Sequence, residues 1–222
     1  RPWVMRWPYP KAGDPNPNVA LVVASTSGGA LQRIDTTKYA DFLIVNVAWS
    51  RDGAVVFHVQ NRQQTWLDFN RADASTGTFR TLFRETTPAW VERWADSSAD
   101  PLWLNDGSFL WLSERSGWRH FYHYAADGRL IGQVTRGEWE VRTHQGLDPA
   151  ETWIYFSSTT ASPFGLDLYR VRLDGTGLER LSAIDGKHES FLDPSRTLFL
   201  DSRSDINTPP QVRLHRVGTR DA

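Results

Sequence analysis

Trp49-Ser50-Arg51-Asp52-Gly53-Ala54-Val55-Val56-Phe57 and Trp103-Leu104-Asn105-Asp106-Gly107-Ser108-Phe109-Leu110-Trp111 share one pattern, a turn dipeptide followed by an apolar strand. Asp-Gly is typical of a tight hairpin turn because glycine, and to a lesser degree aspartate, tolerates a positive φ. Two degraded copies follow, with Asp148-Pro149 before residues 153–156 and Asp193-Pro194 before residues 198–200. The chain therefore contains a weak internal repeat.

The spacing of this repeat indicates the fold class. The turn aspartates Asp52, Asp106, Asp148 and Asp193 are separated by 54, 42 and 45 residues (106−52, 148−106 and 193−148). One blade of a β-propeller takes roughly 40–50 residues. Within each copy the strand-like segments are short, rich in aliphatic and aromatic residues, and end at Gly, Asp, Asn or Pro. No window carries a helical apolar stripe over three turns. We therefore expect an all-β chain of β-propeller blades, each a four-stranded antiparallel meander.

The repeat also predicts how the chain divides. Alternating prolines hold residues 6–18 near polyproline II and exclude them from a central strand. We expect one propeller fragment with these parts: residues 1–38, a proline-rich connector and the end of a preceding blade; residues 39–99, 100–144 and 145–187, one blade each; and residues 188–222, the start of a further blade.

Composition excludes several classes of function. The 25 Lys and Arg residues nearly balance the 26 Asp and Glu residues, so no general attraction to phosphate backbones is expected and nucleic acid is not an expected partner. The longest aliphatic run, residues 19–24, is far shorter than the ~20 residues of a membrane-spanning helix. Because the chain has no cysteine, disulfides, thiolate metal sites and a cysteine nucleophile are excluded. No cofactor is expected.

Histidines and ion pairs are interpreted structurally. An offset of three on a strand places His120 and His123 on opposite faces, so a shared metal ion is not expected. His188 is expected to organise a turn through its ring nitrogens. The segments Glu114-Arg115 and Asp201-Ser202-Arg203 contain catalytic residue types, but we expect them to tie adjacent blades together through carboxylate–guanidinium pairs.

The eleven tryptophans could stack on sugars or bases, but most are expected to serve packing. Trp49, Trp103, Trp111 and Trp153 occupy similar places in the repeated strands, where large side chains fill the space between neighbouring blades. Trp94 lies outside this pattern, in a polar loop, and is the exception.

Several short segments, in order over nearly the whole chain, carry a resemblance to a known family. They are Tyr9-Pro10-Lys11-Ala12-Gly13 with Asn16-Pro17 downstream, Gln60-Asn61-Arg62-Gln63, Ser113-Glu114-Arg115-Ser116-Gly117-Trp118-Arg119-His120, Gly137-Glu138-Trp139-Glu140-Val141, and Gly186-Lys187-His188 followed by Asp193-Pro194 and Asp201-Ser202. The ordered set resembles the propeller domain of the dipeptidyl peptidase IV family of serine exopeptidases and its bacterial members.

The resemblance implies an eight-bladed propeller that caps an α/β-hydrolase domain, with the active site in the cavity between them. Members remove dipeptides from peptide N-termini when the second residue is Pro or Ala. Their nucleophile, acid and histidine lie in the hydrolase domain, and no Gly-x-Ser-x-Gly elbow occurs in this sequence. Their paired glutamates, which bind the substrate amine, lie upstream of the segment that matches residues 9–13. We therefore expect no catalytic residue in this chain.

One substrate-binding position follows from the resemblance. After a Trp-Val pair, animal members have an aromatic residue and an arginine that line an outer substrate pocket. This chain reads Trp90-Val91-Glu92-Arg93-Trp94-Ala95, so Trp94 retains the aromatic ring whereas Ala95 loses the charge. Trp94 is the only substrate-binding candidate.

The expected function is therefore a non-catalytic propeller portion of a dipeptidyl-peptidase-like serine exopeptidase, which walls and gates the substrate cavity. The expected partners are the α/β-hydrolase domain of the same protein, a peptide substrate, and a second copy in a homo-oligomer. The absence of cysteine and of Asn-x-Ser/Thr glycosylation acceptors fits a bacterial protein better than an animal ectodomain, and a periplasmic or secreted location is favoured. Two alternatives stay open: a free-standing propeller segment that binds a protein or peptide, and a propeller glycosidase, which would need two carboxylates facing one pocket.

Overall fold

The computed structural model describes residues 3–6, 11, 13–92, 101–182 and 185–219. The chain forms two compact units, Arg1–Glu92 and Arg93–Ala222. Every regular element in the described ranges is a β-strand, and all strand pairs within the sheets are antiparallel. The prediction of an all-β chain is confirmed.

The first unit contains a two-stranded ribbon and a four-stranded meander. The ribbon pairs β1 (Val22–Val23) with β2 (Gln32–Arg33), and the meander runs β3 (Phe42–Trp49), β4 (Val55–Asn61), β5 (Trp66–Ala72) and β6 (Phe79–Thr86). Apolar β-branched and aromatic residues of β4 pack with Ile34, which follows β2, and Ile34 is fully buried. The ribbon and the meander therefore share one core.

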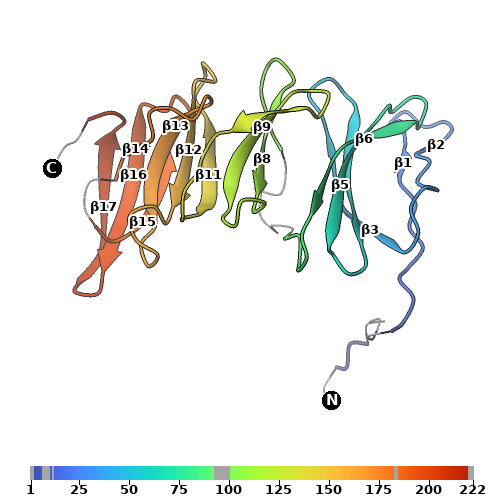
Figure 1. Ribbon diagram of the computed structural model, residues 1–222, viewed down its shortest axis with the longest axis horizontal. Helices are drawn as coiled ribbons and strands as arrows, with labels where there is room; N and C mark the ends of the chain where they lie inside the picture. The colour runs from blue at the N-terminus through green and yellow to red at the C-terminus, as the bar shows by residue number, and fades with distance from the viewer. Residues whose placement is uncertain (1–2, 7–10, 12, 93–100, 183–184, 220–222) are drawn as a thin grey trace. The chain divides into compact units, whose positions relative to one another are not determined.

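The second unit contains three sheets that follow one another along the chain, coloured from green to red in Figure 1. Their strands are β7 (Leu102–Trp103), β8 (Phe109–Ser113), β9 (His120–Tyr124) and β10 (Leu130–Gln133); β11 (Val141–Leu147), β12 (Trp153–Ser158), β13 (Asp167–Arg172) and β14 (Glu179–Arg180); and β15 (Lys187–Leu192), β16 (Leu198–Asp205) and β17 (Thr208–Arg216). The predicted boundary between residues 144 and 145 falls within β11.

The four repeated turns connect the first and second strands of their sheets. Gly53 and Gly107 have φ values of 80° and 82°, as an Asp-Gly hairpin requires. In the two Asp-Pro copies the left-handed residue is Glu151 (φ 54°) or Arg196 (φ 59°), three positions after the aspartate. The degraded copies therefore keep the turn and place a long polar side chain at its left-handed position.

The main apolar core of the second unit lies between its first two sheets. Leu110, Leu112 and Phe121 belong to the same buried cluster as Ile154 and Phe156. The rings of Phe121 and Phe156 meet edge to face with centroids 5.8 Å apart. Alternation along β8 and β12 presents these side chains to one another, so the two sheets stack face to face.

The packing prediction holds for some tryptophans and not for others. Trp111 is only 8% exposed, whereas Trp103 and Trp153 are half-buried. Trp49 is 60% exposed, so its prediction as a packed core residue is wrong. Trp49 shares a face of β3 with Val47, two residues earlier, which is also exposed. The repeat placed the residue correctly along the strand but not on the buried face.

Candidate functional site

Two equivalent backbone hydrogen bonds join consecutive sheets of the second unit. The N–H of Val141, which opens β11, donates to the carbonyl of Arg119 before β9 at 2.9 Å. The N–H of His188 near the start of β15 donates to the carbonyl of Leu166 before β13, also at 2.9 Å. In both cases the first strand of one sheet is bonded to the start of the third strand of the preceding sheet.

The first residue of that third strand carries a side-chain link to the segment after the fourth strand. His120 Nδ1 lies 3.1 Å from Thr135 Oγ1, and its Nε2 lies 3.0 Å from the carbonyl of Gly137. At the equivalent position Asp167 accepts a hydrogen bond from Ser182 Oγ at 2.8 Å. Both links lie at the segment that connects one sheet to the next, and they fix the path of the chain there.

The left-handed turn residues form a second tie between sheets. Both carboxylate oxygens of Glu151 accept the N–H of Asn105, each at 2.9 Å. Arg196 Nε donates to the carbonyl of Leu147 at 3.0 Å, and its Nη2 donates to that of Gln145. The same turn position therefore reaches back to the preceding sheet in both copies.

A buried polar cluster, which we call the His188 cluster, lies where the last two sheets meet. It comprises Asp167, Arg180, Ser182, His188, Ser190 and Asp201. His188 Nδ1 lies 2.6 Å from Asp201 Oδ2, and its Nε2 lies 3.6 Å from Asp167 Oδ1. Ser190 Oγ donates to Asp201 Oδ1 at 2.8 Å. The side chains of His188 and Asp167 are each 2% exposed.

Serine, histidine and aspartate meet in this cluster, but in the wrong order for nucleophilic catalysis. A catalytic triad needs the serine hydroxyl on one imidazole nitrogen and the aspartate on the other. Here both ring nitrogens of His188 face carboxylates, and Ser190 donates to Asp201 instead. No ring nitrogen is available as a base for Ser190, so the cluster joins two sheets rather than activating a nucleophile.

Asp167 is the most heavily bonded acceptor of the cluster. Arg180 donates to its Oδ1 through Nε at 3.1 Å and Nη2 at 2.7 Å, and Arg180 Nη1 also reaches Asp185 at 3.0 Å. The first unit contains a comparable pair, in which Arg84 donates to both oxygens of Asp68 at 2.6 and 2.9 Å. In each case a carboxylate on a third strand binds a guanidinium on the fourth.

The electrostatics of these carboxylates follow from burial and donors. Burial opposes ionisation of Asp201, but hydrogen bonds from His188 and Ser190 outweigh it, so the pKa of Asp201 is lowered. Beside Asp68, burial raises the pKa of Tyr39 to about 12, and Tyr39 donates to Asp68 at 2.8 Å. Asp201 is therefore an anion at neutral pH, whereas Tyr39 is a neutral donor.

The structure corrects one sequence-based interpretation and refines others. His188 lies inside β15 and pairs with aspartates of two sheets, so the expectation that it organises a turn is wrong. Asp201 does join two sheets, through His188. Arg115 lies 4.5 Å from the centroid of Tyr122 and donates to Ser113 Oγ at 2.9 Å, both within its own sheet.

His120 and His123 bind different partners, since His123 Nε2 lies 2.9 Å from Ser108 Oγ. Burial lowers the pKa of both imidazoles. Among the described residues, no three side chains of the metal-binding types come together. In the same part of the chain, no helix has the length and apolarity to cross a bilayer. The substrate-binding candidate Trp94 lies outside the described residues.

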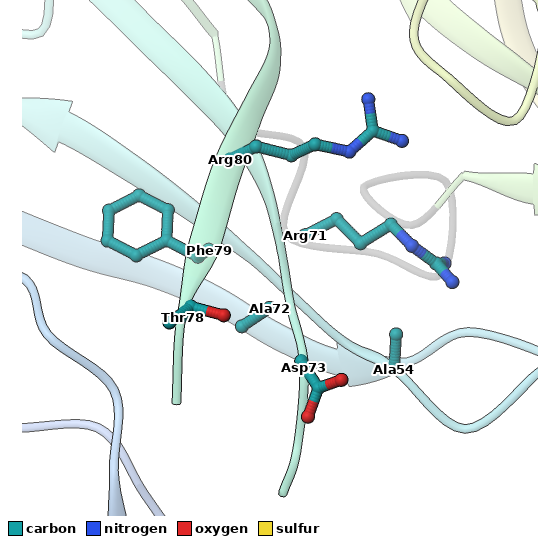
Figure 2. A pocket seen from close by; sticks show the side chains of 7 residues that line it. All are labelled: Ala54, Arg71, Ala72, Asp73, Thr78, Phe79 and Arg80. Atoms are coloured by element: carbon teal, nitrogen blue, oxygen red, sulfur yellow. The ribbon is translucent and has the colours of Figure 1, made fainter. Parts of the chain in front are cut away.

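Among the clefts of the described surface, one lies in the first unit and another in the second. The first, of about 340 Å³, follows the β5–β6 hairpin, and Figure 2 shows Arg71 and Arg80 extending to the same side of it. Arg71 is paired with Asp52 and Ser50. The second, of about 510 Å³, has Asp167 and Arg180 of the His188 cluster in its wall. Phe164 and Ile206 also line it and are 96% and 99% exposed.

Sequence reasoning missed the residues that join the sheets. Asp167, Arg180, Glu151 and Arg196 belong to no motif that predicts a role. A usable signal existed for Glu151 and Arg196, which hold the same place in the two Asp-Pro turns. Asp167 and Arg180 gave no such signal, because neither the fourth strand nor its crossing to the next sheet repeats in sequence.

Known proteins resemble this chain along most of its length. The family model described as "Dipeptidyl peptidase IV (DPP IV) N-terminal region" matches residues 1–210. The "Inactive dipeptidyl peptidase 10" of Mus musculus is 28% identical over 188 residues, which cover 78% of this chain and 23% of that protein. The "Probable dipeptidyl-aminopeptidase B" of Emericella nidulans is 30% identical over 195 residues, 82% of this chain and 21% of that protein. The chain thus spans less than a quarter of either relative.

Solved structures share the fold. The dipeptidyl peptidase 4 of Porphyromonas gingivalis superimposes with a TM-score of 0.83 and 22% sequence identity, covering 94% of this chain and 29% of that one. The prediction of propeller blades made of antiparallel meanders is confirmed. Because the family model covers nearly all of the sequence, the chain belongs to the family described as the dipeptidyl peptidase IV N-terminal region.

Proposed function

We propose that this chain is a non-catalytic propeller portion of a dipeptidyl-peptidase-like serine exopeptidase, in which it walls and gates the substrate cavity beside an α/β-hydrolase domain. The observation that carries the proposal is the family match over residues 1–210. It is supported by a second observation on the described residues that bring Ser, His and Asp together. In the His188 cluster Ser190 donates to Asp201, and beside His123 Ser108 donates to Asp106, so neither serine donates to a histidine as catalysis requires. The chemistry is then supplied by another part of the protein.

The mechanical role rests on how the sheets of the second unit are joined. Each junction has a backbone hydrogen bond, a side-chain link at the third strand and a turn residue that reaches back. Such paired ties resist sliding of one blade past the next, since several hydrogen bonds would break together. A cavity wall needs this rigidity to keep its loops in place.

The reading frame that encodes the chain provides the test. A Gly-x-Ser-x-Gly segment downstream, together with release of dipeptides from Ala-Pro or Gly-Pro chromogenic peptides by the encoded protein, supports the proposal. A frame with no such segment, or an encoded protein that leaves these peptides intact, contradicts it.

A second candidate is a propeller segment that binds a protein or peptide partner without peptidase activity. The relative named "Inactive dipeptidyl peptidase 10" favours it, because that name describes a protein without the activity. The same experiment separates the two: an encoded protein with a hydrolase-like segment but no activity points to the binding role.

Two further parts of the proposal concern partners. Trp94 is proposed as an aromatic wall of an outer substrate pocket, and a Trp94→Ala variant of the active protein should raise KM and leave kcat unchanged.

Self-association is proposed because Phe191, Leu200 and Leu214 are cross-strand neighbours on one face of the last sheet, each about half exposed or more. Light scattering that finds only monomer at high concentration would exclude it.

A further inference from the structure

His188 occupies a place in its sheet where the equivalent residue of the preceding sheet is apolar. Val141 opens β11 and is fully buried, and its N–H makes the same inter-sheet hydrogen bond as that of His188. The cross-strand partners of Val141 and His188 are Ser158 and Arg203. Two residues before these partners lie Phe156 of β12, which is fully buried, and Asp201 of β16. These two positions are therefore apolar at one junction, whereas at the next they hold a histidine and an aspartate.

The hydrogen-bonding capacity of imidazole restricts the state of His188. A neutral imidazole has one N–H and one lone pair, whereas imidazolium has two N–H groups. Both ring nitrogens face carboxylate oxygens, at 2.6 Å for Asp201 and 3.6 Å for Asp167. In the neutral form one ring nitrogen would present its lone pair to a carboxylate, whereas imidazolium presents an N–H and a positive charge to both.

Charge balance leads to the same state. Asp167 and Asp201 are almost fully buried, and a buried charge is stable only with a compensating partner. Arg180 neutralises Asp167 but also pairs with the exposed Asp185. With a neutral His188, two buried anions would share one cation. With an imidazolium, Asp167, Asp201, Arg180 and His188 sum to zero.

Each strand packed against His188 contributes further charged groups around the cluster. Lys187 and Glu189 flank it on β15 and are exposed. On the remaining elements they are Asp167 of β13, Arg180 of β14, Asp185 of the connection, Asp201 and Arg203 of β16, and Arg213 and His215 of β17. Arg203, the cross-strand partner of His188, donates to the carbonyl of Asp185 and to Asp205. His188 is the only titratable group among them whose ring lies between two buried carboxylates.

We propose that His188 is a buried imidazolium at neutral pH and that this cation couples the β11–β14 blade to the β15–β17 blade, which makes the junction between them sensitive to alkaline pH. When the ring loses its proton, its positive charge beside Asp167 and Asp201 is lost and the cluster gains an uncompensated negative charge. A histidine that keeps its proton in the folded state adds stability that is complete below about pH 6.5 and is lost as the folded form deprotonates at higher pH.

Nitrogen-15 NMR of the histidine-labelled chain at pH 7.5 tests the protonation state directly in the wild-type sequence. We expect both ring nitrogens of His188 to carry protons, whereas His123 is neutral, because burial lowers the pKa of His123. The chain has six histidines. The signals of His188 can be assigned among them through correlations with the backbone, or because they disappear in a His188→Gln variant. A neutral His188 ring at pH 7.5, in either tautomer, would overturn the proposal.

Hydrogen exchange of the β15 backbone amides tests the coupling. After correction for intrinsic exchange, we expect the protection factors of the β15 amides to fall by about tenfold or more between pH 6.5 and 9. The fall follows from weakening of the junction between the β11–β14 and β15–β17 sheets. The matched control His123→Gln, which alters a half-buried histidine within a single sheet, should show the same fall. His188→Gln should remove the pH dependence. If wild type shows no change in protection over this range, the coupling is refuted, and this result does not depend on whether the variants fold.

Discussion

Removing the carboxylate of Asp167 tests how much the His188 cluster contributes to the second unit. Asp167 is 2% exposed and accepts hydrogen bonds from Arg180 Nε, Arg180 Nη2 and Ser182 Oγ at 3.1, 2.7 and 2.8 Å. Breaking a buried ion pair by deleting one partner costs roughly 3–5 kcal/mol. Arg180 keeps Asp185 as a partner and is partly exposed, so we expect Asp167→Ala to cost about 3 kcal/mol.

Thermal unfolding followed by circular dichroism measures this cost. In a chain of this size, about 3 kcal/mol corresponds to a fall in Tm of roughly 6–12 °C. The matched control is Asp174→Ala, which removes an exposed turn aspartate that accepts hydrogen bonds from the N–H and Oγ1 of Thr176 at 2.8 and 2.7 Å. The control should lower Tm far less. Equal shifts for the two variants, or a fall below about 2 °C for Asp167→Ala, would refute the role given to the cluster.

Three further predictions concern residues outside the His188 cluster. Arg196→Ala should cost about 2–3 kcal/mol in urea unfolding, because it removes charged hydrogen bonds to two carbonyls of the preceding sheet; an unchanged midpoint would contradict this. Trp111→Ala should cost about 3–5 kcal/mol and Trp49→Ala less than about 1 kcal/mol, since Trp111 is buried and Trp49 exposed; similar losses would count against the packing. Hydrogen bonds lower the pKa of Asp52 and Asp193 to about 2 from an ordinary value of 3.8, so the stability they add is present above about pH 4 and lost as pH falls toward 2, and Tm measured from pH 5 to 2 should decline; a flat profile would disprove it.

The sequence predicts the blades well because their signals are local. Asp-Gly turns and alternating apolar strands determine β3–β4 and β7–β8 without knowledge of distant contacts. The Asp-Pro copies at 148 and 193 are equally visible, since the aspartate and the left-handed residue lie within one turn. Spacing between the copies then indicates the number of sheets.

The junctions between blades could not be predicted from the same patterns. His188 contacts Asp201, 13 residues away on a neighbouring strand, and Asp167, 21 residues away in another sheet (188−167). Their meeting depends on register and on the path of the crossing segment, which no short pattern specifies. Likewise, whether Trp49 faces the core depends on which face of β3 the neighbouring elements cover.

The most direct test of the proposed function is to label the whole encoded protein with a fluorophosphonate probe and to map the modified serine by peptide mass spectrometry. We predict that the labelled serine lies outside residues 1–222, and that the purified 222-residue chain neither reacts with the probe nor hydrolyses Gly-Pro or Ala-Pro chromogenic substrates. Stoichiometric labelling of a serine within residues 1–222, Ser190 of the His188 cluster included, would contradict it.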